Sequence, residues 1–228
     1  LFPRERNGRA DGSKVETPVP ERIVRLGEIV SKNVGSNPKA TYQSAMEALE
    51  LLRSHPDRKK ELFFLNTVAE ACNMMGNYQE AQRYGTLARQ LARKLGEKVK
   101  EADALYTISR SYWYREKYND AREAYRQAHR LYQAEDHKEG LARSLQLRGL
   151  IAWRLGEFAV ALEYLQEATE AYEILGYKKG IADLTNISGV LSLDLKREKA
   201  ALEFFEKARV IYAQTDDLPG VSKTLHNM

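Results

Sequence analysis

The sequence is poor in residues that cross-link a chain or break its regular structure. It has one cysteine, Cys72, among 228 residues, so it cannot form an internal disulfide. Its 6 prolines and 14 glycines are too few for a collagenous or low-complexity chain. No apolar run approaches the roughly 20 residues that span a bilayer, and no signal peptide is visible. We therefore expect a folded protein without membrane insertion, in the cytoplasm or, as the alternative, in the periplasm.

The sequence also lacks the patterns that carry catalysis, metal binding or nucleic-acid recognition. Its 36 basic and 32 acidic residues are interspersed, so we predict no basic face for nucleic acid. It has no Gly-Lys-Ser/Thr phosphate loop, and no histidine is placed to activate Cys72, which we expect in the core. The histidines have no metal-ligand spacing: His55, His129, His137 and His226. We therefore predict a chain that is not an enzyme and holds no cofactor or metal.

What the sequence has instead is a period of forty residues. The run Gly-Asn-Tyr-Gln-Glu-Ala at 76–81 has related runs at 116–121 and 156–161, and a weaker one at 196–201. Small residues recur in two rows: Ala81, Ala121, Ala161 and Ala201, then Ala88, Ala128, Ala168 and Ala208. A fixed period of this size is typical of a repeat array, in which each unit packs on the next.

Each period predicts two antiparallel helices joined by a short turn. The first helices are predicted at about 60–75, 99–115, 139–155 and 179–195, and the second at about 77–95, 117–135, 157–175 and 197–214. We expect a flexible leader or linker at 1–19 and one repeat domain at 20–228. Within the domain we expect a degenerate pair at 20–56, repeats at about 59–96, 99–136, 139–176 and 179–216, and the start of a further helix at 219–228.

These units resemble tetratricopeptide repeats. The motif residues are Gly76, Tyr78, Ala81, Tyr84 and Ala88, then Tyr118, Ala121, Tyr125 and Ala128, then Gly156, Phe158, Ala161, Tyr164 and Ala168. The fourth copy is poorer, with Glu198 at the aromatic position. The length of the period resembles that of kinesin light chains, of polarity scaffolds and of many bacterial regulators. The resemblance implies an all-α fold, a right-handed α-solenoid whose first helices line a concave groove that binds a peptide or protein segment.

The forty-residue register then predicts which side chains face the groove. They are Asn66, Glu70, Asn73, Tyr106, Arg110, Trp113, Tyr114, Gln146, Leu150, Trp153, Arg154 and Asn186. Trp, Tyr and Arg dominate binding energy at interfaces, and Asn or Gln amides can hold a peptide backbone. The alternative for Trp113 and Trp153 is packing between helices. Packing is also what we expect for Tyr132, Tyr172 and Tyr212, on the second helices.

We expect a non-catalytic scaffold that captures a peptide or protein segment. The alternative is a sensing input domain of a larger bacterial signalling enzyme, such as a nucleotide cyclase or kinase, or of a transcription regulator. The chain begins at Leu1 rather than Met, which favours a fragment or a processed form. The apolar edge at 219–228 adds self-association as a further partner hypothesis. A groove of the class that grips C-terminal carboxylates is not predicted, because the corresponding positions hold Phe63, Asp103, Arg143 and Asp183.

Overall fold

The computed structural model describes residues 18–33 and 35–228, and every regular element in that part of the chain is an α-helix. The helices are α1 (Val19–Asn33), α2 (Pro38–Ser54), α3 (Arg58–Met74), α4 (Tyr78–Leu95), α5 (Lys98–Tyr114), α6 (Tyr118–Ala134), α7 (Lys138–Arg154), α8 (Phe158–Ile174), α9 (Lys178–Asp194), α10 (Glu198–Gln214) and α11 (Leu218–Asn227). From α3 to α10 they begin and end within two residues of the predicted limits. The predicted leader lies outside the described residues up to residue 17. Among the helices described, none is long and apolar enough to cross a membrane.

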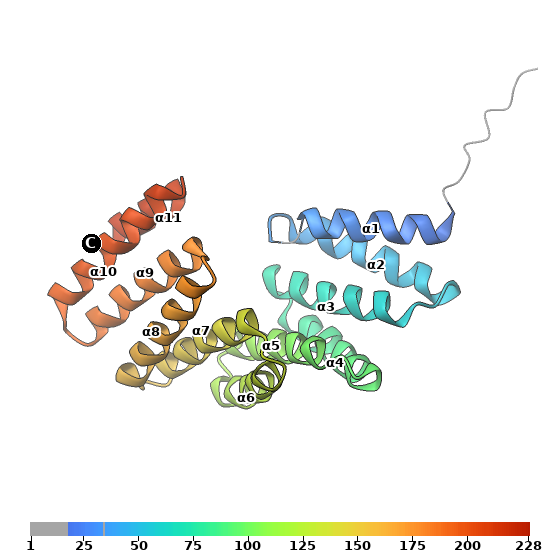
Figure 1. Cartoon of the computed structure of the whole chain (residues 1–228), viewed down its shortest axis with the longest axis horizontal. Helices are drawn as coiled ribbons and strands as arrows, with labels where there is room; N and C mark the ends of the chain where they lie inside the picture. Colours follow the sequence, from blue (N-terminus) through green and yellow to red (C-terminus); the bar gives the residue numbers. More distant parts are fainter. Residues whose placement is uncertain (1–17, 34) are drawn as a thin grey trace, which may run out of the picture.

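The helices form a curved array that follows the order of the chain (Figure 1). Each helix packs against its neighbours in sequence, and α5 also packs against α3 and α7. In Figure 1 the array runs as an arc from α1 to α11, with α3, α5 and α7 on its inner side. Contacts limited to neighbouring repeats are the property that defines a solenoid. The predicted all-α solenoid is therefore confirmed.

Small side chains stand where the helices approach one another. The alanines of both predicted rows are buried, with exposed fractions of 0–1%. Bulky side chains such as Phe205 and Leu165 fill the spaces between them. Cys72 is buried too, and burial raises the pKa of its thiol to about 11, so the thiol stays protonated at neutral pH. Small-against-large packing in a constant register brings the core to native density along the whole array.

The turn inside each repeat requires one residue in the left-handed region. Gly76 and Gly156 adopt φ of 79° and 78° there, and Glu116 and Lys196 adopt φ of 59° and 60° at the equivalent positions. Glycine enters this region freely, whereas a side chain meets the following carbonyl group. Two of the four turns therefore hold a residue that the backbone does not favour.

We expect Glu116→Gly and Lys196→Gly each to raise the free energy of unfolding by about 0.5–1 kcal/mol. Both side chains are exposed, so little packing is lost by removing them. The measurement is the urea midpoint of each variant. Gly156→Ala is the matched control and is expected to lower stability by a similar amount. A lower midpoint for both glycine variants would contradict this account of the turns.

Candidate functional site

Three buried tyrosines pack at the contact between one repeat and the next. The ring of Tyr132 lies where a β-carbon on Gly140 would be, at 2.3 Å from that position. Tyr212 stands in the same relation to Gly220, also at 2.3 Å. Tyr172 takes the equivalent place in the middle repeat, 3.0 Å from the β-carbon position of Gly180. The prediction that these tyrosines pack against the following repeat is confirmed.

The hydroxyl groups of these tyrosines extend to the inner side of the array. Tyr132 donates to Asp103 Oδ1 at 2.8 Å, and Tyr212 donates to Asp183 Oδ1 at 2.6 Å. Tyr172 cannot form the same bond, because the position equivalent to Asp103 and Asp183 holds Arg143, and an arginine side chain accepts no hydrogen bond. Tyr172 therefore donates to Gln146 Oε1 at 2.9 Å. One residue type thus packs the repeats together and orients the polar side chains of the first helices.

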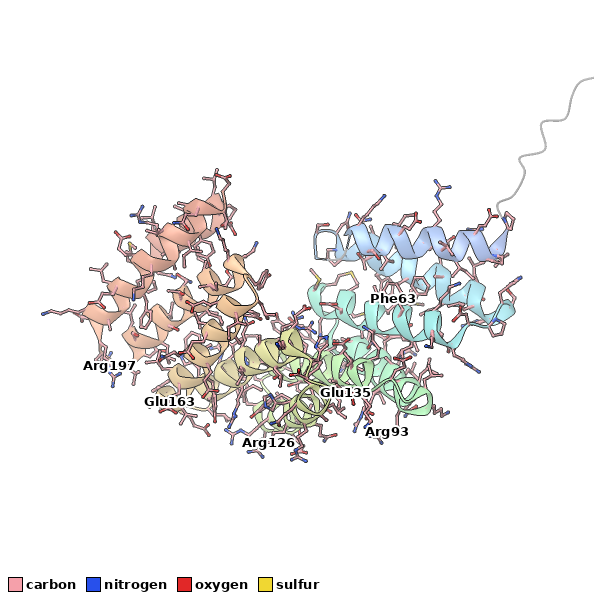
Figure 2. All side chains as sticks on the ribbon, viewed as in Figure 1. Phe63, Arg93, Arg126, Glu135, Glu163 and Arg197 are labelled. Carbon is pink, nitrogen blue, oxygen red and sulfur yellow. The ribbon has the colours of Figure 1, made fainter. Side chains whose placement is uncertain are left out.

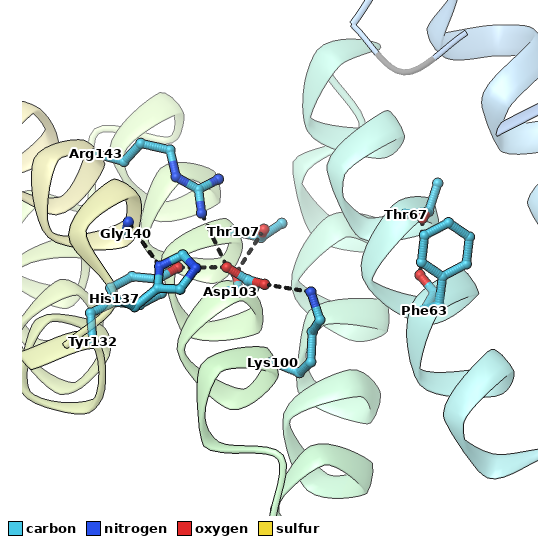
Figure 3. Close-up of polar contacts among 9 residues, drawn as sticks. All are labelled: Phe63, Thr67, Lys100, Asp103, Thr107, Tyr132, His137, Gly140 and Arg143. Carbon is cyan, nitrogen blue, oxygen red and sulfur yellow. Dashed lines mark hydrogen bonds and ion pairs between the residues drawn. The ribbon is translucent and has the colours of Figure 1, made fainter. Parts of the chain in front are cut away.

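Asp103 is the centre of a polar network on this inner side (Figure 3). Besides the Tyr132 hydroxyl, its Oδ1 accepts from Arg143 Nη2 at 3.1 Å, and its Oδ2 accepts from Lys100 Nζ at 3.2 Å. The Arg143 guanidinium also lies 5.2 Å from the ring centroid of Tyr106. The network joins α5, α6 and α7, so the position of each charge depends on the packing of two repeats.

Two cavities lie on either side of this network and share Tyr106 and Arg143 in their walls. The first, which we call the α3 cavity, measures about 300 Å³ and is also lined by Phe63, Asn66, Glu70, Lys100 and Asp103. The second, the α9 cavity, measures about 430 Å³ and is also lined by Glu139, Gln146, Tyr172, Tyr177 and Asp183. Cavities of this size accommodate small ligands or the side chains of a bound peptide.

The α3 cavity holds polar atoms that the protein leaves unsatisfied. Both Nδ2 and Oδ1 of Asn66 are buried and have no hydrogen-bond partner among the described residues. The same is true of Arg143 Nε. Buried polar groups in native proteins nearly always have a partner, and an unsatisfied one costs about 1–3 kcal/mol. Their position in a cavity wall makes a ligand a natural partner.

Burial perturbs the tyrosines of this region. It raises the pKa of Tyr106, Tyr132, Tyr172 and Tyr212, and the Asp103 carboxylate raises that of Tyr132 further. The raised pKa means that folding favours the neutral phenol. Stability from this source is complete below the usual value of 10.0 and is lost as the pH rises above it.

We therefore expect the protein to lose stability steeply above pH 10, with the phenolate absorbance of these tyrosines appearing only as the array unfolds. The measurement is an alkaline titration followed in parallel by ultraviolet absorbance and by circular dichroism. Tyr132→Phe should lose less stability between neutral and alkaline pH than the wild type. Full phenolate absorbance in a protein that keeps its helices would contradict the prediction.

The structure brings four of the predicted groove residues to the cavities: Asn66 and Glu70 to the α3 cavity, Gln146 to the α9 cavity and Tyr106 to both. Glu70 also lies 3.9 Å from Arg110, which stands over the Tyr106 ring. Leu150 is half-buried on α7 and lines neither cavity.

Two predicted groove residues are structural instead. Asn73 is 3% exposed, donates to the Thr107 carbonyl at 2.8 Å and accepts from Ser111 Oγ at 2.7 Å. Asn186 is 1% exposed and accepts from Asn227 Nδ2 at 3.1 Å. Both residues occupy groove positions in the forty-residue register. Their side chains nevertheless point between helices, where each amide bonds the first helix of the next repeat. The prediction that they face the groove is therefore corrected.

The predicted tryptophans lie at the other end of the first helices, away from both cavities. Arg154 is exposed and lies over both Trp113 and Trp153, at 5.7 and 5.5 Å from the ring centroids. Trp153 Nε1 donates to Asp194 Oδ2 at 2.6 Å. Tyr114 stacks on Tyr78 at 5.0 Å. We call this group of side chains the aromatic rim. Both tryptophans are half-buried, so each packs and still presents surface.

The residues that organise the cavities were not predicted from the sequence. Phe63, Asp103, Arg143 and Asp183 form one column in the forty-residue register, and all four line a cavity. The column was visible in the sequence, where it served only to reject a known class of groove. The signal that could have found it is the tyrosine that recurs on α6, α8 and α10, because Tyr132 and Tyr212 each stand 29 residues after an aspartate.

Comparisons with known proteins agree with the repeat fold. A family model described as Tetratricopeptide repeat matches residues 62–134, and a second of the same description matches residues 142–174. A search of curated proteins found no significant match.

Solved structures of the same fold share little sequence identity with the chain. The Rap conjugation gene regulator of plasmid pLS20, solved with the Phr* peptide, has a TM-score of 0.80 at 15% identity, over 96% of this chain and 62% of that one. Aspartyl phosphate phosphatase F from Bacillus subtilis has a TM-score of 0.77 at 14% identity, over 92% of this chain and 54% of that one. Kinesin light chain repeats from Podospora anserina have a TM-score of 0.64 at 14% identity, over 88% of this chain and 99% of that one.

The chain thus spans a little over half the length of the first two relatives. The TM-scores show a shared fold and, at this low identity, nothing more, while the family assignment comes from the matched repeats. Residues 62–134 and 142–174 of this chain therefore belong to the tetratricopeptide-repeat family.

Proposed function

We propose that this chain binds an extended peptide or protein segment along its inner side and performs no catalytic step itself. The observation that carries the proposal is the Asn66 amide, whose donor and acceptor are both buried and unpartnered in the wall of the α3 cavity. A peptide group offers one acceptor and one donor, which are the complements of that amide. An extended backbone would satisfy both atoms, and this mode of binding makes modest demands on sequence.

The cavities supply room for side chains beside that backbone. They adjoin at Tyr106 and Arg143, so a segment held at Asn66 and continuing toward Asp183 would pass both. Gln146 accepts from Tyr172, and this bond fixes the orientation of its amide in the α9 cavity. Pre-oriented groups cost less entropy on binding, which favours a groove over a flexible surface.

The aromatic rim offers a second stretch of contact. Trp113 Nε1 is buried without a hydrogen-bond partner among the described residues, and Arg154 stands beside it. Aromatic and arginine side chains in such settings dominate binding energies. Two relatives of this fold are described as complexes, one with the Phr* peptide and one with competence and sporulation factor. Those descriptions support a ligand of the peptide class for this groove.

The test is selection of short random peptides on the immobilised protein, followed by affinity measurement of an enriched peptide by fluorescence anisotropy. We expect Asn66→Ala to weaken binding about tenfold or more, since one bidentate amide contact is lost. Trp113→Ala combined with Trp153→Ala should also weaken it if the rim takes part. Asn119→Ala, on an exposed position of α6, is the matched control. Absence of any enriched peptide, or equal binding by Asn66→Ala, would refute the proposal.

A second candidate is a regulatory input domain within a longer protein. The observation that favours it is the coverage of the relatives, because the chain spans 62% of a gene regulator and 54% of a phosphatase of the same fold. Reading the coding sequence beyond residue 228 tests it. A cyclase, kinase or helix-turn-helix sequence there would support this role, and an immediate stop codon would contradict it.

A further inference from the structure

We propose that the α9 cavity selects a basic side chain, lysine or arginine, in the segment that the groove binds. This inference rests on the proposed peptide-binding function and adds a chemical preference to it. It follows from the distribution of charge between the two cavities, from their walls and from the partners of each charged group.

In the α3 cavity every charged group has an opposite charge at hand. Asp103 lies 3.2 Å from Lys100 and 3.1 Å from Arg143, and Glu70 lies 3.9 Å from Arg110. Each charged side chain in the wall of the α3 cavity is therefore paired with an opposite charge of the protein. A ligand group gains more here from hydrogen bonds, such as those of Asn66, than from charge.

The α9 cavity differs, because neither of its two carboxylates belongs to an ion pair of the described residues. Neither Glu139 nor Asp183 forms an ion pair within the described part of the chain, and Asp183 receives only the neutral hydroxyl of Tyr212. Arg143, the one cation in the wall, is already bound to Asp103. Lys179, on the same helix as Asp183, lies 3.3 Å from Asp217 instead. Arg143 and Lys179 still attract Glu139 and Asp183 at longer range. Because two carboxylates and one arginine line the cavity and that arginine is shared with Asp103, the wall carries a net negative charge.

The remaining wall suits the stem of a long basic side chain. Tyr106, Tyr172 and Tyr177 contribute rings, and Tyr177 is 51% exposed. Tyr172 and Tyr177 meet edge to face with their centroids 5.2 Å apart. Aromatic rings attract ammonium and guanidinium groups and also cover the methylene groups of lysine and arginine. Opposite charge and an aromatic wall together favour a cation over a neutral residue of equal size.

The experiment compares the selected peptides of three proteins: the wild type, Glu139→Gln with Asp183→Asn, and Glu163→Gln with Glu167→Gln. The last is a matched control, because it removes the same charge from exposed residues of α8. Figure 2 shows Glu163 on the outer side of the arc. Asparagine at 183 still accepts the Tyr212 hydrogen bond, and thermal denaturation of each variant verifies its fold.

We expect wild type and control to enrich peptides with lysine or arginine, and the cavity variant to enrich peptides without that preference. Replacing the basic residue of an enriched peptide by norleucine should weaken wild-type binding about tenfold and leave the cavity variant nearly unchanged. Enrichment of peptides with no basic residue would overturn this inference and leave the proposed function intact. Enrichment of no peptide at all would overturn both.

Discussion

Tyr132→Ala is expected to lower the free energy of unfolding by about 3–5 kcal/mol, the cost of removing a large buried ring. Tyr132 is fully buried, packs on Gly140 and also holds Asp103 through its hydroxyl. Gly140→Lys should also destabilise, by about 1–3 kcal/mol, because its β-carbon would lie 2.3 Å from the ring. Urea denaturation followed by circular dichroism measures both.

The double variant Tyr132→Ala with Gly140→Lys should lose less stability than the sum of the two single changes. The first repeat supports this expectation, since Ala92 and Lys100 stand at the equivalent positions there and α4 still packs on α5. Residues in direct contact are coupled by about 0.5–3 kcal/mol in such cycles. Additive losses would show that the tyrosine and the glycine contribute independently, against the packing described here.

Asp103→Ala is expected to cost about 2–4 kcal/mol and to disorganise the groove. It would leave Arg143 and Lys100 without their carboxylate and the Tyr132 hydroxyl without an acceptor. Asp103→Asn should cost less, because the acceptor for Tyr132 is kept. Urea midpoints measure stability, and anisotropy with a selected peptide measures the groove.

Asp183→Ala is the internal comparison for this prediction. Asp183 occupies the same place two repeats later, but it accepts only the Tyr212 hydroxyl and forms no ion pair within the described residues, since Lys179 pairs with Asp217. We expect it to cost about 1–2 kcal/mol, the loss of one hydrogen bond to a charged acceptor. An equal loss at both positions would mean that the ion pairs around Asp103 add nothing to stability.

Most of the fold could be predicted from the sequence, because it depends on spacing. The forty-residue period places Ala81 and Ala121 at equivalent contacts, and the helix limits follow from where the small residues and turns recur. The turns recur by the same register, and the structure shows that Gly76, Glu116, Gly156 and Lys196 all adopt a left-handed conformation there. The same contact recurs several times in one chain, so each copy supports the assignment of the others.

The site could be predicted only in part. Asn66, Tyr106 and Gln146, which the register predicted for the groove, line the cavities, and their role in binding stays a prediction. It also nominated Asn73 and Asn186, which turn inward to bond neighbouring helices. A residue's position in a helix determines the direction of its Cα–Cβ bond. Its rotamer depends on which hydrogen-bond partners and which free space the neighbouring helix provides.

By itself, then, the sequence determined the period and the helix pairs, because these depend on contacts within a repeat and between one repeat and the next. Only the tertiary structure decided which polar atoms were satisfied. In it Tyr132, Lys100 and Arg143 all bond Asp103. Among the described residues, both polar atoms of Asn66 have no partner, and Glu139 and Asp183 form no ion pair. Hydrogen bonds form only over a narrow range of donor–acceptor distance, and across repeats that distance is set by how the helices pack. The spacing of residues along the chain does not specify it.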